Sequence, residues 1–444
     1  MRQMRFKLYV YISILCLTGC ASNHQKLLYN KKPAFYSYII GNIENGHINL
    51  EHESDAYSTP ASCQKVITAL LAYKMLGSNY FYETKLYAKK KNRRVQDLII
   101  HFSGDPTLKS EDLITLLQPV KGRSILGNII LDASFFRTNP HSPNIMTGDV
   151  GTSYGQPVSS MIIDQNLIIV TAEPKEFGKI HIKNDSGYFI DSAVTTTTSP
   201  SSIKLAWSGQ HIMVKGGMNF KDSPLEFKLS PREIDNYILY KVKVAMKALN
   251  IRGKVKITHN RAQLSEDFSL INNVSSKPLE HIIPPALKKS DNLVFDSLYL
   301  TIANSQNPDG IEEWSQGNNI MKGLIQKYFD VNVENAVLVD GSGLSRYNRI
   351  QARKLLQILK RGHSMKEFVN ALPAPREANS TLEKRDILSK SIRAKTGNMS
   401  GISCLCGYNM GPYPKAFVIM VNSFSAPQQE IISVMDRFIS YHLR

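Results

Sequence analysis

Residues 60–77, PASCQKVITALLAYKMLG, are apolar on almost every side, which predicts an enclosed helix. Thr59 can cap the start of this helix, and Gly77 follows its end. Among its polar side chains, Ser62 and Lys65 lie in the first turns, one turn apart on the same face. Since an enclosed helix needs neither of them for packing, the pair is a candidate for chemistry.

The pattern changes character twice along the chain. Residues 34–50 alternate as strands do, around a turn at Asn45-Gly46. From Tyr82 to about Asn272, short alternating stretches between turn residues predict mostly strands. The exceptions there are helices expected at 109–118 and 232–250 and a low-complexity loop at 195–202.

A helical pattern returns at Lys277. The elements expected in this last part are helices near Leu287–Ile302, 311–328 and 350–361, strands at 392–408 and 415–424, and a final helix at 430–443. Strands flanked by helices therefore begin, are interrupted by a long β-rich segment, and resume. We predict an α/β (α+β) fold in which an antiparallel sheet flanked by helices carries β-rich inserted domains.

Length and charge add to this prediction. The chain has 444 residues, too many for one core, and a net charge of +17. A basic surface suits nucleic acid, anionic lipid or an acidic polymer such as peptidoglycan. Because Lys and Arg are scattered without a dense run, a solvated surface with no partner is the alternative.

The N-terminus predicts export. A basic start (MRQMRFK) is followed by ten apolar residues, too few to span a bilayer, and then by TGCASN. Leu17-Thr18-Gly19-Cys20 resembles the bacterial lipobox, in which the cysteine is lipidated and becomes the first residue. We expect a periplasmic protein held by lipid on Cys20 at the periplasmic side of the outer membrane. An ordinary cleaved signal peptide is the alternative.

The remaining cysteines do not form an evident disulfide framework. Cys63, Cys404 and Cys406 stay after export, and an odd number leaves at least one thiol free. Cys404 and Cys406 alternate on one strand, a poor spacing for a mutual bridge. No Cys/His spacing fits zinc, so we expect neither a metal nor a cofactor.

Ser62 and Lys65 have the spacing of a serine activated by a lysine. A serine hydroxyl is a weak nucleophile until a base takes its proton, and lysine can be that base when burial or a second cation lowers its pKa. The spacing alone is weak evidence, because Ser201 and Lys204 repeat it in the Thr/Ser-rich loop.

An ordered set of three motifs is far more specific. In chain order it consists of Ser62-x-x-Lys65, Ser290-Asp291-Asn292 and Lys395-Thr396-Gly397. The first opens the apolar helix, the second precedes an apolar run, and the third lies on a strand before the last strand and helix. This trio is typical of penicillin-binding proteins and serine β-lactamases.

The long β-rich gap between the first and second motifs resembles the peptidase S13 family, the class C, low-molecular-mass penicillin-binding proteins of the PBP4/DacB type. Stretches such as FSGDPTL, GNIILDASFF, YGQPVSSMIIDQN and DGSGLSRYN resemble it in the same order. The resemblance implies a penicillin-binding, serine β-lactamase-like transpeptidase domain. It also implies a division into a signal peptide (1–19), a split catalytic domain (20–85 and 273–444), an inserted domain II (86–168 and 229–272) and a nested domain III (169–228).

The resemblance further implies roles. Ser62 would be acylated, Lys65 would be its base, Ser290 would pass the proton to the leaving D-alanine, Asn292 would hold the substrate peptide and Lys395 would lower the pKa of its neighbours. The backbone N–H groups of Ser62 and Asn398 would form the oxyanion hole, where each donor contributes roughly 3–4 kcal/mol.

A second group of residues would bind substrate: Thr396, Gly397, Asn398, Asp149, Tyr154, Arg346 and Ser400. An acid with a base suits the zwitterionic end of a diaminopimelate side chain, so Asp149 and Arg346 are expected to serve that end together. Asp149 shaping a Gly-rich turn, and Arg346 forming a structural ion pair, are the alternatives.

Three features depart from the family pattern. Asn398 stands where a hydroxyl residue is usual, Cys63 lies beside the nucleophile, and Pro284 and Pro285 occupy the helix before Ser290. Because proline breaks helical hydrogen bonds, we expect that helix to start at the prolines.

We therefore expect a serine DD-peptidase that removes terminal D-alanine or cleaves D-alanine–diaminopimelate cross-links and binds β-lactams covalently. A β-lactamase of the same fold and a non-enzymatic wall-binding lipoprotein are the alternatives. The expected partners are peptidoglycan stem peptides, β-lactam antibiotics and, through the lipid, a membrane; no nucleic acid is expected.

Overall fold

The computed structural model describes residues 34–443 except 93, 144, 177–178, 263 and 308–309. The expected signal segment and Cys20 lie outside the described residues. Within the described part of the chain, none of the helices combines the length and apolar character that crossing a membrane requires.

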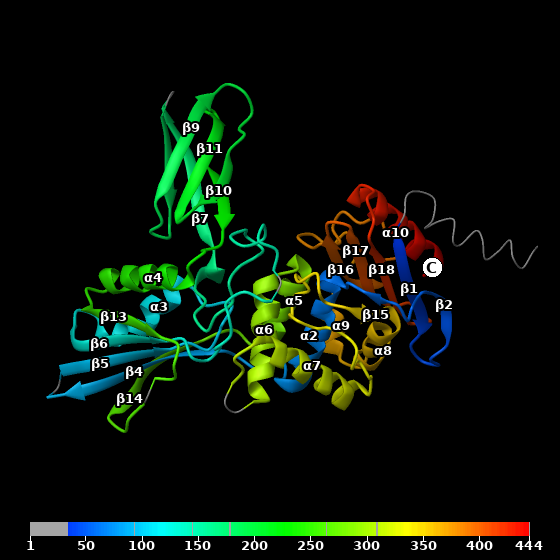
Figure 1. The fold of residues 1–444 in the computed structure, drawn as a ribbon, viewed down its shortest axis with the longest axis horizontal. Coiled ribbons are helices and arrows are strands. Elements are labelled where there is room, and N and C mark those ends of the chain that lie inside the picture. The colour runs from blue at the N-terminus through cyan, green and yellow to red at the C-terminus, as the bar shows by residue number, and fades with distance from the viewer. Residues whose placement is uncertain are drawn as a thin grey trace, which may run out of the picture.

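One five-stranded antiparallel sheet forms the centre of residues 34–82 and 276–443, which we call the catalytic region after the predicted catalytic domain (Figure 1). Its strands, in spatial order, are β16 (Ile392–Met399), β17 (Ile402–Asn409), β18 (Lys415–Asn422), β1 (Phe35–Asn42) and β2 (Ile48–His52). The first strands of the chain therefore lie beside the last ones, which confirms that the sheet begins, is interrupted and resumes.

Alternation along these strands separates two apolar cores. Tyr36, Tyr38 and Ile40 of β1 pack with α10 (Gln428–His442) on one face, whereas Ile39 belongs to the core on the other face. That second core holds the helices α2 (Gln64–Met75), α5 (Leu279–Lys289), α6 (Asn292–Ser305), α7 (Trp314–Phe329), α8 (Ala352–Gly362) and α9 (Lys366–Ala371). The expected antiparallel sheet flanked by helices is confirmed.

The interrupting segment builds three further sheets, on the left of Figure 1. A five-stranded sheet has the order β13 (Arg252–Thr258), β6 (Ser124–Asp132), β5 (Arg94–His101), β4 (Glu83–Lys91) and β14 (Phe268–Ser275), and packs with α3 (Ser110–Leu117) and α4 (Ile234–Ala248). Two three-stranded sheets complete the segment. One has the order β12 (Leu225–Leu229), β7 (Ile168–Glu176) and β8 (Lys179–Asn184), and the other has the order β10 (Lys204–Ser208), β11 (His211–Asn219) and β9 (Ile190–Thr197). We call residues 83–275 the inserted region.

Several element boundaries differ from the expectation. The helix expected over 60–77 begins with a 3₁₀ turn at Ala61–Cys63. The side chain of Thr59 does not cap this helix but contacts Arg349. The single strand expected at 392–408 is a hairpin, because Gly401 with φ +72° permits a tight turn between β16 and β17.

The helix expected near Leu287–Ile302 is two helices. α5 and α6 are separated at Ser290, whose φ of 58° is left-handed and ends α5. The expectation that α5 starts at Pro284 and Pro285 is also wrong, since both lie inside it. Burial of one apolar face of α5 compensates for the hydrogen bonds that the prolines remove.

Candidate active site

The turn that carries Ser62 is held from two sides by glycines. Ala61, directly before Ser62, is buried and has a φ of 46°, a conformation that alanine rarely adopts. A Cβ on Gly343 would lie 1.9 Å from the Ala61 carbonyl oxygen. One on Gly397 would lie 2.9 Å from the Ser62 nitrogen. Only glycine at both positions lets the flanking chain approach the turn that carries Ser62 so closely.

The Lys65 ammonium contacts three acceptors at once. Its Nζ donates to Ser62 Oγ at 2.9 Å, to Asn292 Oδ1 at 2.7 Å and to the carbonyl oxygen of Ser342 at 2.6 Å. Two of the three motifs found in the sequence therefore meet at a single nitrogen. The 3₁₀ turn before α2 supplies Ser62, the first turn of α2 supplies Lys65, and the start of α6 supplies Asn292; α2 and α6 are labelled in Figure 1.

Lys65 has the electrostatics of a base. Burial, assisted by the charge of Lys395, lowers the pKa of Lys65 to about 7. Lys395 is itself fully buried, and burial lowers its pKa to about 8. The sequence predicted that burial or a second cation would do this, and both contribute.

Two buried carboxyl groups near Lys65 complete its environment. Burial raises the pKa of Asp296 well above its ordinary value, and the nearby Asp340 raises it further. Asp296 accepts hydrogen bonds from the backbone N–H groups of Gly341 and Ser342, at 3.0 and 2.7 Å. Asp340 receives backbone N–H groups of its own turn, as expected of a turn residue.

Asp296 was missed by the sequence reasoning. The signal that could have found it is a carboxylate one helical turn after Asn292 in an otherwise apolar helix, on the same face. Asp296 holds the turn that presents the Ser342 carbonyl to Lys65, so it positions one of the three acceptors.

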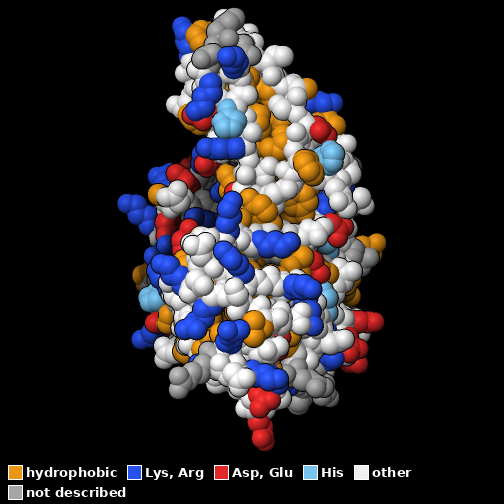
Figure 2. All heavy atoms as spheres, turned by 90° about the vertical axis from the view of Figure 1, so that its left-hand side faces the viewer, with side chains coloured by type: hydrophobic (Ala, Val, Ile, Leu, Met, Phe, Trp, Pro, Cys, Tyr) orange, Lys and Arg blue, Asp and Glu red, His pale blue; other side chains and the backbone are white. Residues whose placement is uncertain are grey.

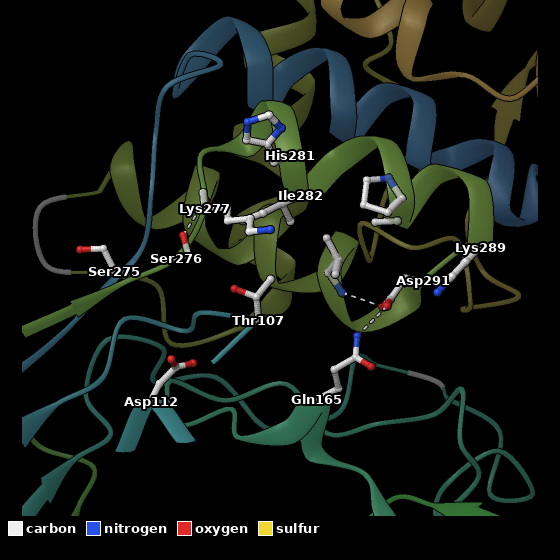
Figure 3. Close-up of a pocket in the computed structure, with 13 residues that line it drawn as sticks. Thr107, Asp112, Gln165, Ser275, Ser276, Lys277, His281, Ile282, Lys289 and Asp291 are labelled. Carbon is white, nitrogen blue, oxygen red and sulfur yellow. Dashed lines mark hydrogen bonds between the residues drawn. The ribbon is translucent and has the colours of Figure 1, made fainter. Parts of the chain in front are cut away.

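The middle motif is anchored by its aspartate. Asp291 caps α6 by accepting the N–H of Val294 at 3.1 Å, and it accepts the Gln165 side-chain amide at 3.1 Å (Figure 3). Gln165 lies in a turn of three consecutive left-handed residues in the inserted region. The bond therefore ties that region to the motif, at the edge of a pocket of about 410 Å³.

Ser290, the first residue of this motif, has no hydrogen-bond partner for its side chain within the described part of the chain. The Ser290 hydroxyl therefore makes no hydrogen bond to any described residue. In the third motif, the ammonium of Lys395 donates to the carbonyl of its neighbour Thr396 at 2.6 Å. The side chain of Thr396 donates to Thr381 at 2.7 Å, which was not expected. Asn398 Oδ1 accepts from Ser403 and Gln428, so that side chain is tied to its own sheet and to α10.

Of the residues of the insert that were expected to bind substrate, Tyr154 contacts the middle motif and Asp149 contacts Tyr154. Asn292 Nδ2 donates to the carbonyl of Tyr154 at 2.8 Å, and the Tyr154 hydroxyl donates to Asp149 at 2.9 Å. Arg346 donates to the Ser400 carbonyl at 3.0 Å and contacts Met146 Sδ at 3.1 Å. Asp149 and Arg346 form no ion pair with each other among the described residues, but both contact Met146, whose carbonyl accepts the backbone N–H of Asp149 at 2.8 Å.

Among the described residues, the cysteines form no disulfide and no metal site is found. Cys63, Cys404 and Cys406 are all buried and free, and Cys63 Sγ donates to the Lys395 carbonyl at 3.3 Å. Over the residues that the structure describes, no group of three or more His, Cys, Asp or Glu side chains is arranged to hold a metal ion.

Comparison with known proteins decides the family. The residue pattern of the D-Ala-D-Ala carboxypeptidase 3 (S13) family matches residues 25–441. The chain belongs to this family. It is 25% identical over 421 residues to D-alanyl-D-alanine carboxypeptidase DacB of Haemophilus influenzae, covering 88% of this chain and 86% of that protein. It is 26% identical over 404 residues to a D-alanyl-D-alanine carboxypeptidase of Actinomadura sp., covering 83% of this chain and 74% of that protein.

Solved structures show the same fold. Penicillin binding protein 4 (dacB) of Haemophilus influenzae superposes with a TM-score of 0.81 at 24% identity, over 94% of this chain and 98% of that one. A predatory peptidoglycan endopeptidase of Bdellovibrio bacteriovorus gives a TM-score of 0.53 at 17% identity, over 92% of this chain and 91% of that one. The predicted penicillin-binding fold is confirmed.

Family membership confirms the predicted function at its general level. The protein is a serine-type D-Ala-D-Ala carboxypeptidase, a hydrolase of peptidoglycan metabolism, and the β-lactamase alternative is not favoured. The roles of individual residues in this family member stay predictions.

Proposed function

We propose that this protein cleaves the D-Ala-D-Ala end of peptidoglycan stem peptides through an acyl-enzyme on Ser62. The observation that carries the proposal is the set of three contacts made by Lys65. A neutral lysine amine keeps two N–H bonds and one lone pair. Asn292 Oδ1 and the Ser342 carbonyl can only accept, so they take both N–H bonds and leave the lone pair for the Ser62 hydroxyl.

The acylation step follows from this arrangement. Lys65 takes the hydroxyl proton as Ser62 Oγ bonds to the carbonyl carbon of the penultimate D-alanine. The developing oxyanion is received by the backbone N–H groups of Ser62 and Asn398. The C–N bond to the terminal D-alanine breaks, and the leaving nitrogen takes a proton through Ser290. Water then hydrolyses the ester, returning Ser62 and releasing the shortened peptide.

The remaining predicted residues bind substrate in this proposal. Lys395 and Thr396 receive the terminal carboxylate, and Gly397 leaves room for the substrate along β16. Asp149, Tyr154, Arg346 and Ser400 hold the end of the diaminopimelate side chain, with Asp149 for its ammonium group and Arg346 for its carboxylate. The same pocket accepts either a free stem peptide or a cross-linked one, which allows both carboxypeptidase and endopeptidase action.

Binding of β-lactams belongs to the same proposal. One structure of Haemophilus influenzae penicillin binding protein 4 is complexed with a β-lactam. A β-lactam ring presents a strained amide where D-Ala-D-Ala presents its peptide bond, so Ser62 is expected to open it and remain acylated.

Location and domain organisation are proposed on sequence grounds. We infer that lipid on Cys20 holds the protein at the periplasmic side of the outer membrane. We retain the division into signal (1–19), catalytic domain (20–85 and 273–444), domain II (86–168 and 229–272) and domain III (169–228). Incorporation of labelled palmitate into the wild type, and its loss in Cys20→Ala, tests the anchor.

A fluorescent penicillin tests the central proposal. Stable labelling of the wild type that disappears in Ser62→Ala supports the acyl-enzyme. Rapid turnover of the label indicates a β-lactamase, and absence of labelling indicates a non-enzymatic protein. Purified muropeptides then separate loss of terminal D-alanine from cleavage of cross-linked dimers.

A further inference from the structure

The inserted region carries a groove whose charged lining residues are all cations. A groove of about 700 Å³ lies between the C-terminal end of α4 and the edge strand β13. Four basic residues line it, Lys243, Lys247, Arg252 and Lys254, and no carboxylate does. All four are exposed, and among the described residues none of them makes an ion pair.

Sequence order conceals this groove, and folding creates it. Residues 236–265 contain no Asp or Glu but seven Lys or Arg: Lys241, Lys243, Lys247, Arg252, Lys254, Lys256 and Arg261. Spread over a helix and a strand, they do not form a dense run. The turn after α4 returns the chain along its own helix end and gathers four of them around one hollow. Figure 2 shows Lys and Arg side chains across the middle of this face, with acidic ones mainly toward its margins.

Leaving these charges unneutralised has a cost. Lys243 and Lys247 are four residues apart on α4, a like-charge spacing that destabilises a helix slightly. Elsewhere in the same region cations do have acidic partners: Lys89 pairs with Asp267 at 2.9 Å and Lys85 with Glu83 at 3.0 Å. Acids are thus available to this region but are missing at the groove, which fits a surface that is neutralised by a ligand.

The position of the groove favours an extended ligand. α4 and β13 lie at one end of the long axis of the molecule, β1 lies at the other end, and α2 and α6 with the nucleophile lie between them (Figure 1). A small anion could occupy the groove but would have no connection with the catalytic site. A polymer with repeated carboxylates can reach both places.

We propose that this groove, Lys243/Lys247/Arg252/Lys254, binds carboxylates of a neighbouring stretch of the same peptidoglycan polymer whose stem peptide occupies the active site. The inference rests on the peptidoglycan activity described above and adds a second contact to it. Each exposed ion pair is weak on its own. Several of them on one polymer raise the effective concentration of further stem peptides at Ser62.

The test compares two variants of equal charge. In the groove variant, Lys243, Lys247, Arg252 and Lys254 are all changed to Gln. In the control variant the four changed to Gln are Lys183, Lys204, Lys215 and Lys228, which are exposed on the two small sheets. Both are made with Ser62→Ala in the full chain for binding, so that the polymer is not consumed, and with Ser62 intact for activity.

Binding is measured by co-sedimentation with intact, insoluble peptidoglycan. We expect the groove variant to bind about tenfold more weakly than the wild type and the control variant, since four weak ion pairs together contribute about that factor. Amidating the carboxylates of the polymer or raising the salt concentration should remove the difference. Hydrolysis of intact peptidoglycan should fall with binding, while kcat/KM for a soluble muropeptide stays the same in all three proteins.

Four outcomes would overturn the inference. These are equal sedimentation of groove variant and wild type, binding that is insensitive to amidation, equal loss in the control variant, and groove-dependent binding to vesicles of anionic lipid but not to peptidoglycan. Failure of the proposed function looks different, because the wild type would then not hydrolyse the soluble muropeptide at all.

Discussion

The catalytic region buries Lys65 and the inserted region buries Lys241, and the pKa values of these two lysines are shifted in opposite directions. Lys65 is completely buried and touches a hydroxyl, an amide oxygen and a carbonyl, and its pKa falls to about 7. Lys241 is 7% exposed and touches the carboxylates of Asp164 and Asp185 at 3.0 and 2.9 Å, and its pKa is raised.

Burial by itself therefore does not make a lysine into a base. In both places burial acts to lower the pKa of the lysine. At Lys241 two carboxylates in direct contact outweigh burial, so its ammonium is a permanent link between α4 and the turns that carry Asp164 and Asp185. At Lys65 the carboxyl groups of Asp296 and Asp340 act through intervening backbone, and neutral acceptors occupy the contact positions.

The largest effect is expected from removing the base. Lys65→Met should slow acylation by a fluorescent penicillin by about 10⁴-fold or more, as removal of a catalytic base does in serine hydrolases. Lys241→Met is the matched control and should label at a rate near that of the wild type while unfolding more easily. A Lys65→Met protein that labels as fast as the wild type would exclude Lys65 as the base.

The next largest effect is expected from giving Lys65 a carboxylate partner like those of Lys241. Asn292→Asp places a carboxylate where Oδ1 now lies, 2.7 Å from Lys65 Nζ. The pKa of Lys65 should rise, so acylation at neutral pH should fall by about 10²-fold and recover at alkaline pH. Asn292→Ala controls for the lost substrate contact, because it should reduce the rate without moving the profile upward in pH.

The wild-type pH profile is the third way to sharpen the comparison. With the pKa of Lys65 at about 7, the neutral base is lost on acidification. The acylation rate should therefore fall about tenfold per pH unit below that value and level off above it. The same shift acts on stability. Between pH 7 and the ordinary lysine value the unfolded chain binds more protons, so this group makes the fold more stable as the pH rises. An acylation rate that stays constant between pH 5 and 7 would contradict the assignment of Lys65 as the base.

A substitution at Lys241 or its partners in the inserted region should lower the free energy of unfolding and leave penicillin labelling unchanged. Asp164→Asn removes one carboxylate from the buried Lys241 ammonium and should lower the free energy of unfolding by about 2 kcal/mol. The measurement is urea denaturation, with penicillin labelling at saturation as the check on the active site. A large loss of labelling in fully folded protein would mean that the two regions are coupled more tightly than their lysines indicate.

The smallest effect is expected where the two regions touch. Gln165→Asn keeps a residue that tolerates the left-handed φ of 59° but is too short to reach Asp291. Losing one hydrogen bond to a buried carboxyl should reduce kcat/KM by about tenfold at most. Gln165→Glu, which keeps the length but repels Asp291, should reduce it further. Equal values for both variants and the wild type would show that the contact does not position the motif.

The pattern of apolar residues predicted most elements but misplaced their ends near the site. The helices at Ser110–Leu117, Ile234–Ala248 and Ala352–Gly362 lie where periodicity predicted them. The start of α2 and the break at Ser290 do not, because both depend on left-handed residues that only the surrounding chain stabilises. The secondary-structure propensity of a short segment does not depend on such tertiary contacts, so it cannot predict these boundaries.

The three motifs, their order, the interruption between them and hence the family could all be predicted from the amino-acid sequence, since each depends on residue identity and spacing along the chain. Which side chains contact one another became visible only in the folded chain. Folding placed Asn292 and the Ser342 carbonyl on Lys65, brought Asp296 and Gln165 into the site, and gathered scattered cations around one groove. The physical reason is that charge and pKa depend on distances in space, and these are set by how the helices and sheets pack.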